Sequence, residues 1–381
     1  MALEGEQLTA LNLLRGWWND PQAPQSFVLM GAAGTGKSFT LSVFMSELGI
    51  DPSTVMFCTL SGKAALVLRN RGIESACTIH SLIYIPYEHV TRSGKTEMRF
   101  RKRSAVDPQI KLIVIDECSM IDNGIIDDVL SYKTKVIFVG DKFQLKPISG
   151  VNSLMNQTPD AELTTPRRQA LDNSILRVAT DIRQGNTITQ YGMIGNNVLR
   201  VDMDFINKNQ DILKNAEQVI CGANKTRHGL NNNIRNLLGF KQEDDESPFW
   251  LPCNKDKVIC TRNNHALGLI NGQIGYITYL HEAIPTKDYC KFNFVDTEGN
   301  RYNNTKSVLD LFERDINYED FTFSQKAHQQ FQFGYAITAH KSQGSEWSNI
   351  VVFEEITGSP YLNWLYTAVT RAKINLIMVE C

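Results

Sequence analysis

Short apolar runs, each ending in polar or glycine residues, alternate along this chain with longer segments of helical periodicity. In the first half, four runs have the length of buried strands: residues 26–30, 54–60, 111–116 and 135–141. In the second half the rhythm returns at residues 217–225, 333–341, 349–355 and 374–380. Apolar runs without alternation are typical of parallel strands buried on both faces, so the pattern predicts two α/β lobes.

Length, composition and charge are those of an ordinary folded protein. The chain has 381 residues, of which 42% are hydrophobic and 21% are charged, and its formal net charge is -2. This length allows two packed cores. Because the near-neutral charge gives no overall basic field, any nucleic-acid binding must come from local patches. The eight cysteines are scattered without a CxxC pair, which favours reduced thiols over disulfides or zinc ligands.

No stretch of the sequence predicts export or membrane insertion. The N-terminal segment has no basic region before an apolar core. No uninterrupted apolar run approaches the ~20 residues that a membrane helix needs. We therefore expect an intracellular protein.

The segment GAAGTGKS follows the first predicted strand directly and precedes a predicted helix. It fits the G-x-x-x-x-G-K-S pattern of a phosphate-binding loop in the strand-loop-helix context that this pattern requires. Its backbone N–H groups can surround a triphosphate, Lys37 can reach the β and γ phosphates, and Ser38 can ligate Mg²⁺. A glycine-rich turn without function is the less favoured alternative. The predicted loop residues are Gly31, Ala32, Ala33, Gly34, Thr35, Gly36, Lys37 and Ser38.

Two other predicted strands end in polar side chains. In VIDECSM, Asp116 can hold Mg²⁺ and Glu117 can orient and deprotonate an attacking water. In GDKFQLKPI, the strand leads to Asp141 and Gln144, and Gln144 is suited to sense the γ-phosphate. Acid pairs and loop glutamines are commonly surface features, but an open α/β sheet binds its ligand beyond the carboxyl ends of its strands. We therefore predict that one lobe binds ATP and Mg²⁺.

The order of these motifs resembles that of superfamily 1 helicases. The motifs are, in sequence order, GEQLTA, GAAGTGKS, TLSGKAAL, TIHSL, VIDECSM, GDKFQLKP, LTTPRRQ, YAITAHKSQGSEW and LYTAVTRAK. The similarity is closest to the 5′-to-3′ branch, superfamily 1B, with its RecD-like and Dda-like enzymes and the related Pif family, and it spans nearly the whole chain. It implies an α/β fold with two RecA-like P-loop NTPase lobes, a β-hairpin insert in the first lobe and a small SH3-like β-barrel insert in the second.

The resemblance implies further contacts to the nucleotide. Gln7 would recognise adenine, although a surface glutamine on a helix is an equal alternative. Arg168 and Arg371, from the second lobe, would neutralise charge on the transferring phosphoryl group, and the neighbouring Arg167 could take the place of Arg168. Gly344 and Glu346 would touch the nucleotide from the second lobe.

The resemblance also implies a track for a nucleic-acid strand. The segment YAITAHKSQGSEW would couple the strand to ATP, because its strand-contacting residues directly precede its nucleotide-contacting residues. A packed or capping residue is the alternative for His80. The predicted backbone contacts are Thr59, Ser61, Lys63, Thr78 and His80 in the first lobe, and Thr338, His340, Lys341 and Ser342 in the second.

A basic segment lies between TIHSL and the acid pair. Its alternating residues around Arg92-Ser93-Gly94-Lys95 predict a β-hairpin that carries Phe100 among four basic side chains. A basic run is usually a solvated face. Here it occupies the position of the strand-separating pin in the resembling enzymes, and Phe100 would stack on bases or act as a wedge.

The predicted domain borders follow from these assignments. Residues 1–83 and 109–158 form the first lobe with a pin insert at 84–108, and residues 159–240 and 330–381 form the second lobe with an SH3-like insert at 241–329. In that insert, Asn271-Gly272 and Gly275 predict tight turns, and residues 310–329 receive no role. The chain lacks the long N-terminal extension of larger RecD-like proteins, so we expect a minimal, stand-alone motor.

The sequence thus predicts an ATP-dependent DNA helicase that moves 5′ to 3′ on single-stranded DNA and unwinds duplex DNA with a 5′ tail. The alternative is a strand-stimulated ATPase that remodels nucleoprotein complexes, or acts on RNA, without processive unwinding. We expect a monomer that uses ATP and Mg²⁺, does not bind membranes, and works in the cytoplasm of a bacterium or a phage-infected cell. Single-strand-binding or replication proteins are candidate partners.

Overall fold

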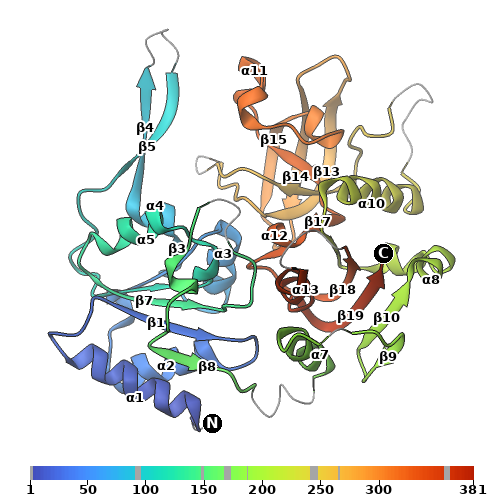
Figure 1. Ribbon diagram of the computed structural model, residues 1–381. Helices are drawn as coiled ribbons and strands as arrows, with labels where there is room; N and C mark the ends of the chain where they lie inside the picture. The colour runs from blue at the N-terminus through green and yellow to red at the C-terminus, as the bar shows by residue number, and fades with distance from the viewer. Residues whose placement is uncertain are drawn as a thin grey trace. The chain divides into compact units, whose positions relative to one another are not determined.

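The chain folds into two compact units. The computed structural model describes residues 3–90, 96–146, 150–166, 173–186, 188–240, 248–264, 267–355 and 361–381. The units are Met1–Arg177 and Val178–Cys381 (Figure 1). Among the described residues, no helix combines the length and the apolar character needed to cross a bilayer.

The first unit is built on a parallel sheet, which has six strands in the described part of the chain. The strand order is β3-β2-β6-β7-β1-β8, and every neighbouring pair is parallel. The strands are β1 (Ser26–Gly31), β2 (Val55–Thr59), β3 (Cys77–Thr78), β6 (Leu112–Ile115), β7 (Lys135–Gly140) and β8 (Ala161–Leu163). The four strands predicted in this half are confirmed.

Helices cover both faces of this sheet. They are α1 (Glu6–Asn19), α2 (Lys37–Glu47), α3 (Gly62–Asn70), α4 (Ile79–Ile83) and α5 (Asn123–Leu130). In β1, Phe27 and Leu29 belong to a core cluster with residues of α1 and α2, whereas Val28 and Met30 belong to one with residues of α4 and α5. Because successive strand residues point to opposite faces, both sets are apolar, and this is the physical origin of the non-alternating runs.

A two-stranded ribbon extends from the first sheet (Figure 1). Its strands β4 (Tyr84–Val90) and β5 (Thr96–Lys102) are antiparallel, with Tyr84 opposite Lys102. The predicted turn at residues 92–95 lies outside the described residues. Tyr132 holds the base of the ribbon, because its hydroxyl lies 3.0 Å from the carbonyl oxygen of Ile83 and 2.9 Å from that of Arg103.

The second unit contains a second α/β sheet, also with six described strands. Their order is β17-β11-β18-β19-β10-β9, and only β9 is antiparallel to its neighbour. The strands are β9 (Gly192–Ile194), β10 (Val198–Asp202), β11 (Gln218–Cys221), β17 (Ala336–Thr338), β18 (Trp347–Glu354) and β19 (Ala372–Glu380). The helices are α7 (Ser174–Arg183), which crosses the border between the units, α8 (Met203–Lys208), α9 (Asp211–Asn215), α10 (Asn224–Leu237), α12 (Ala339–Ser342) and α13 (Tyr361–Val369). Two mainly parallel α/β sheets are thus confirmed.

An antiparallel sheet with five described strands completes the second unit. Its order is β15-β14-β13-β12-β16. The elements are β12 (Lys257–Cys260), β13 (Ile274–Ala283), β14 (Tyr289–Asp296), β15 (Arg301–Val308), β16 (Phe331–Phe333) and the short helix α11 (Phe323–Lys326). Both sheets of this unit share one core, since Val219 and Val351 cluster with Phe292 and Phe331.

The predicted strand at residues 333–341 is divided between the two sheets of the second unit. Its beginning, Phe333, ends β16 of the antiparallel sheet, and β17 of the α/β sheet starts at Ala336. Gly334 makes the change of sheet possible, because a Cβ atom there would lie 3.0 Å from the backbone carbon of Val258. The antiparallel sheet therefore extends beyond residue 329, where the sequence placed its end.

Two further expectations differ from the structure. Gly275 lies within β13 and not in a turn. Glycine is needed at this position because a Cβ atom would collide with the carbonyl oxygen of Val295. The predicted lobe border between residues 158 and 159 is also too early, because β8 pairs with β1 and the units divide between Arg177 and Val178.

A buried ion pair joins α10 to the antiparallel sheet. The Arg235 Nε and the Asp256 Oδ1 are 2.9 Å apart, and both side chains are fully buried. The Asp256 carboxylate also accepts hydrogen bonds from the Tyr335 hydroxyl and the Cys253 backbone N–H. The Arg235 guanidinium lies 4.1 Å from the ring centre of Phe333. One pair thus fixes α10, the segment before β12 and the link between β16 and β17.

Asp256→Asn should lower the free energy of unfolding of the second unit by ~3–5 kcal/mol, because the Arg235 guanidinium would stay buried without a counter-charge. Chemical denaturation of the full chain measures this loss. Asp211→Asn is the control, because Asp211 pairs with Lys214 at the surface and is 78% exposed. A loss no larger than that of the control would show that the buried pair does not stabilise the unit.

Candidate functional site

The GAAGTGKS segment forms a loop between β1 and α2. Gly34 and Gly36 have φ angles of 75° and 89°, a left-handed conformation that suits glycine. A Cβ atom at Gly31 would lie 2.9 Å from the carbonyl oxygen of Leu163. The Lys37 ammonium donates to the carbonyl oxygens of Gly31 and Ala32, at 2.6 and 3.1 Å. The loop is therefore closed by its own lysine.

The first turn of α1 contacts this loop. The Gln7 side chain is 8% exposed, and its Nε2 donates to the carbonyl oxygen of Thr35 at 2.7 Å. This contact supports a place for Gln7 at the loop and contradicts the surface alternative. The neighbouring Glu6 carboxylate accepts hydrogen bonds from the backbone N–H groups of Thr164 and Thr165, at 2.7 and 3.0 Å, and from the Thr164 hydroxyl at 2.6 Å.

The predicted acid pair lies just beyond β6. The Asp116 backbone N–H donates to the carbonyl oxygen of Cys58, and the Asp116 Oδ1 accepts from the Glu117 N–H at 2.9 Å. Burial raises the pKa of Asp116, and the positive charge of Lys37 opposes this rise. Glu117 has a φ of 54°, which is uncommon for a residue with a Cβ atom. Strained backbone of this kind gathers at active sites, so the conformation of Glu117 is consistent with a catalytic role.

Strand β7, which lies between β1 and β6, leads to the third group of polar side chains. Asp141 and Gln144 follow β7 and are 3% and 6% exposed. The Asp141 Oδ1 accepts from the Phe143 backbone N–H at 2.9 Å, and the Gln144 N–H donates to the carbonyl oxygen of Asp141. Within the described residues, the buried Oε1 of Gln144 has no hydrogen-bond partner. Such an atom needs a donor, and a ligand or its attacking water would supply one.

These groups suit a triphosphate and a hard cation. The left-handed Gly34 and Gly36 give the loop the backbone of an anion-binding nest. The Ser38 hydroxyl and the Asp116 carboxylate are oxygen ligands of the type that Mg²⁺ prefers. The described residues contain no cluster of three or more acidic, histidine or cysteine side chains that could hold a metal. Two oxygen ligands from Ser38 and Asp116 would leave the other coordination positions of a cation to phosphate oxygens and water, as is common for Mg²⁺.

The predicted strand contacts of the first unit lie at the ends of β2 and β3. The Thr59 hydroxyl donates to the carbonyl oxygen of Ser61, and Ser61 and Thr78 cap α3 and α4. Lys63 follows in the first turn of α3, and the exposed His80 ring lies 5.5 Å from the ring of Tyr84. All five residues therefore gather near one corner of the sheet. Three of their hydroxyl groups also serve local structure.

In the second unit, the predicted strand contacts occupy the end of β17 and α12. Burial lowers the pKa of His340. The Lys341 ammonium donates to the Gln332 Oε1 at 2.6 Å. Ser342 is fully buried and its hydroxyl donates to the carbonyl oxygen of Ala339 at 2.7 Å. The expected strand contact through the Ser342 side chain is therefore not supported, because that hydroxyl serves its own helix.

The remaining predicted nucleotide contacts have different surroundings. Gly344 has a φ of 73°, and the exposed Glu346 pairs with Lys373 at 3.4 Å. Arg371 is 5% exposed, and its guanidinium donates to the Thr367 carbonyl oxygen and the Thr370 hydroxyl, both at 3.1 Å. It is therefore held against the end of α13. Arg168 lies outside the described residues, as does the neighbouring Arg167.

Phe100 lies on the antiparallel ribbon. Its side chain is 63% exposed and stands opposite Pro86 in the neighbouring strand. Lys102, closer to the base, pairs with Asp128 at 3.1 Å. Contact between so large an apolar ring and water is unfavourable. A base stacked on the ring would remove part of that contact.

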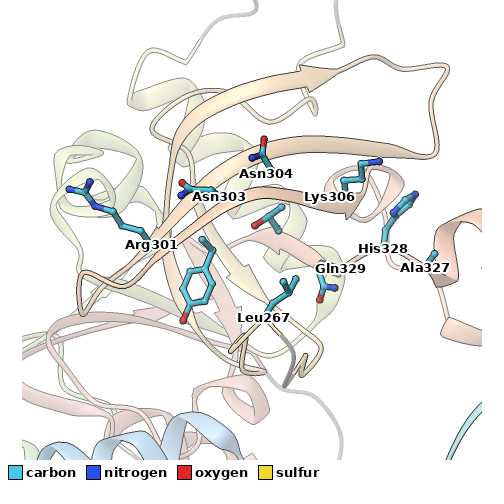
Figure 2. Close-up of a pocket in the computed structure, with 10 residues that line it drawn as sticks. Leu267, Arg301, Asn303, Asn304, Lys306, Ala327, His328 and Gln329 are labelled. Atoms are coloured by element: carbon cyan, nitrogen blue, oxygen red, sulfur yellow. The ribbon is translucent and has the colours of Figure 1, made fainter. Parts of the chain in front are cut away.

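A pocket of about 480 Å³ opens on the antiparallel sheet of the second unit. Figure 2 shows Arg301 and Lys306 on β15, with His328 beside Lys306. The Tyr289 ring lies 4.7 Å from the His328 ring and 4.7 Å from the Lys306 ammonium. None of the predicted site residues is among those that line this pocket.

Two contacts at the site were not expected from the sequence. An acid such as Glu6 at the start of a helix usually only complements the helix dipole, so nothing signalled its bonds to Thr164 and Thr165. The second is a network around Asp315, which meets Arg227 from a position 88 residues away in the sequence. No local pattern indicates such a contact.

Sequence comparison relates two parts of the chain to two families. Residues 21–197 match the AAA domain family and residues 333–379 match the UvrD-like helicase C-terminal domain. The ATP-dependent RecD2 DNA helicase of Deinococcus radiodurans is 26% identical over 97% of this chain. The ATP-dependent DNA helicase Pif1 of Bdellovibrio bacteriovorus is 28% identical over 48% of it. The chain spans 48% of the length of the first relative and 44% of the second.

Solved structures share the fold. A structure of Pif1 helicases on forked double-stranded DNA matches with a TM-score of 0.58 at 19% identity, covering 99% of this chain and 92% of that one. The Pif1 helicase of Candida albicans matches with a TM-score of 0.55 at 16% identity, covering 100% of this chain and 94% of that one. At these identities the likeness concerns the fold, and it agrees with two α/β lobes of RecA-like type.

Glu6→Ala should speed hydrogen exchange of the Thr164 and Thr165 amides several-fold at neutral pH, because both amides lose a charged acceptor. Exchange read by mass spectrometry measures this. Partial burial would raise the pKa of Glu6, but the hydrogen bonds from Thr164 and Thr165 lower this pKa below its usual value. The carboxylate form of Glu6 is therefore fully present at neutral pH, and its contribution is lost only as the pH falls through that lowered value. The exposed neighbour Glu4 is the control, and equal exchange in Glu4→Ala and Glu6→Ala would contradict the contact.

Proposed function

Because the chain belongs to the RecD- and Pif1-like branch of superfamily 1 helicases, we propose that it is an ATP-dependent DNA helicase that moves 5′ to 3′ along a single strand. The observation that carries this proposal is that three motifs meet at the carboxyl ends of three neighbouring strands. The loop with Lys37 follows β1, Asp116 follows β6, and Gln144 follows β7, which lies between them. An edge of this kind can bind and hydrolyse a nucleoside triphosphate.

Each residue of this edge has a role in hydrolysis. Lys37 would leave the carbonyl oxygens of its own loop and bind phosphate oxygens, and Gln7 would recognise the adenine. Ser38 and Asp116 would hold Mg²⁺, which supplies charge neutralisation to the phosphates. Glu117 would orient the attacking water and accept its proton, and the Oε1 of Gln144 would accept a hydrogen bond from the same water. Gly344, Glu346 and Arg371 would contribute from the second unit, and Arg168 would contribute from the part of the chain that precedes the border between the units.

The strand would bind through the ends of β2 and β3 in the first unit and through Thr338, His340 and Lys341 in the second. The ribbon of β4 and β5 would act as the pin that divides the duplex, with Phe100 against the last base pair. The antiparallel sheet of the second unit would be the SH3-like insert. Cycles of nucleotide binding and hydrolysis would alternate the grip of the two units on the strand.

The expected setting follows from this activity. We propose a monomer that works on DNA with a 5′ single-stranded tail in the cytoplasm of a bacterium or a phage-infected cell, together with single-strand-binding or replication proteins. A dependence of the unwinding rate per molecule on protein concentration would contradict the monomer.

Unwinding of tailed duplexes tests the polarity. With ATP and Mg²⁺, a duplex with a 5′ DNA tail should be separated and a duplex with a 3′ tail should not. A third substrate with a 5′ RNA tail tests the choice of strand, because backbone contacts alone do not distinguish the sugars. Product is measured by release of a labelled strand.

Two variants control this measurement. Lys37→Ala should abolish ATP turnover, and Glu117→Gln should bind ATP and fail to hydrolyse it. Wild-type turnover in either variant would contradict the active-site assignment. Strand-stimulated ATP hydrolysis without product from any substrate would favour a remodelling ATPase over a helicase.

Phe100→Ala should lower the unwinding rate on the 5′-tailed duplex by about tenfold and leave strand-stimulated ATP hydrolysis unchanged, because a stacked base contributes ~1–3 kcal/mol. Both rates are measured on the same preparation. Phe205→Ala is the matched control, since that phenylalanine is 39% exposed on α8, away from the ribbon in the sequence. Equal unwinding by both variants would exclude Phe100 as the wedge.

A further inference from the structure

A polar network connects the antiparallel sheet of the second unit to the helix that carries Lys341. Its centre is Asp315, in the connection between β15 and β16. The Asp315 Oδ1 accepts from the Arg227 guanidinium at 2.6 Å and from the Gln332 Nε2 at 2.9 Å. The Asp315 Oδ2 lies 3.2 Å from the His228 Nε2. One carboxylate thus contacts three side chains from two elements.

The contact with Asp315 gives the buried Arg227 guanidinium a counter-charge. Arg227 is 2% exposed, and a buried guanidinium is costly unless a counter-charge and hydrogen bonds accompany it. Asp315 is the carboxylate that the described residues bring to it. The hydrogen bond with His228 lowers the pKa of Asp315, and the charge of Arg227 lowers it further against partial burial. Asp315 therefore stays charged at neutral pH.

The network continues to Lys341 through Gln332. The Gln332 side chain is 5% exposed. Because its Nε2 donates to Asp315, its Oε1 points to the other side, where it accepts from the Lys341 ammonium at 2.6 Å and from Arg227 at 3.2 Å. A carboxylate can only accept, so Asp315 decides which end of the Gln332 amide faces Lys341.

We propose that Asp315 is a positioning residue that acts through Gln332 and Arg227 to hold the Lys341 ammonium, charged and oriented, for contact with the phosphate backbone of a DNA strand. This inference rests on the proposed function of α12 as part of the strand track. It gives a role to the segment of residues 310–329. Asp315 itself does not touch the strand.

The charge of Lys341 is the property that the network controls. Burial and, to a smaller extent, the charge of Arg227 lower the pKa of Lys341 to about 8, and the charge of Asp315 opposes this shift. Two histidines lie near this network: His228 contacts Asp315, and His340 directly precedes Lys341 on α12. The Lys341 side chain is therefore fully protonated well below pH 8 and loses its charge as the pH rises through this value. Its attraction to phosphate is lost with the charge.

Strand affinity as a function of pH tests the proposal. The full chain binds a fluorescent single-stranded DNA oligonucleotide between pH 6.5 and 9.5, and anisotropy gives the Kd at each pH. In the wild type the Kd should rise as the pH passes about 8. In Asp315→Asn the rise should begin at lower pH, because the charge that opposes deprotonation of Lys341 is gone, and the Kd at pH 8 should increase several-fold.

Three further variants define the comparison. Asp315→Glu keeps the charge and should restore the wild-type profile. Asp320→Asn makes the same substitution at an exposed position of the same segment and should not change it. Lys341→Arg should remove the rise near pH 8, because arginine does not titrate there. Thermal unfolding shows whether Asp315→Asn folds. If it does not fold, Lys341→Arg still tests the titration of Lys341.

Each result decides between the hypotheses. An Asp315→Asn profile identical to that of the wild type, or a Lys341→Arg profile that still rises near pH 8, would overturn the role of Asp315. A wild-type chain that binds no strand at any pH would instead contradict the proposed function. A parallel shift of Kd at all pH values in both Asp315→Asn and Asp315→Glu would indicate a merely structural role and would overturn the inference.

Discussion

The second unit depends on the buried pair of Arg235 and Asp256. Neither charge is stable alone away from water, so each fixes the other, and their remaining hydrogen bonds reach the segment before β12 and the hydroxyl of Tyr335. Tyr335 stands where the chain leaves the antiparallel sheet and enters the α/β sheet. The pair therefore holds two sheets of different type around one core, and the segment with Lys341 starts directly from this junction.

In the first unit, the main constraint is tight packing at the carboxyl ends of β1, β6 and β7. Three neighbouring strands end in a phosphate-type loop, an acid pair and a buried glutamine, and the surrounding packing leaves little freedom. A side chain at Gly31 would collide with the carbonyl oxygen of Leu163, and one at Gly140 would lie 2.6 Å from the Cys118 sulfur. The positive φ of Glu117 is tolerated because both its neighbours are fixed, Asp116 by the β2 backbone and Cys118 by burial. Rigid packing thus holds a strained residue in place.

Charge in this protein is controlled more by contacts than by composition. With a net charge of -2, the chain as a whole does not attract DNA. The cations that would hold a strand are instead adjusted singly, as the Lys341 ammonium is by Arg227 and Asp315.

Local patterns of residues were sufficient to predict the two α/β lobes and to place polar side chains at the ends of β1, β6 and β7, because strand burial and phosphate-loop motifs both depend on residues close together in the sequence. Tertiary structure decided what depends on distant partners. It divided residues 333–341 between two sheets at Gly334, put Gly275 inside a strand against Val295, and turned the Ser342 hydroxyl to its own helix. It also brought Asp315 to Arg227 and Glu6 to Thr164. These contacts join positions far apart in the chain, and only the packing of complete elements brings such positions together.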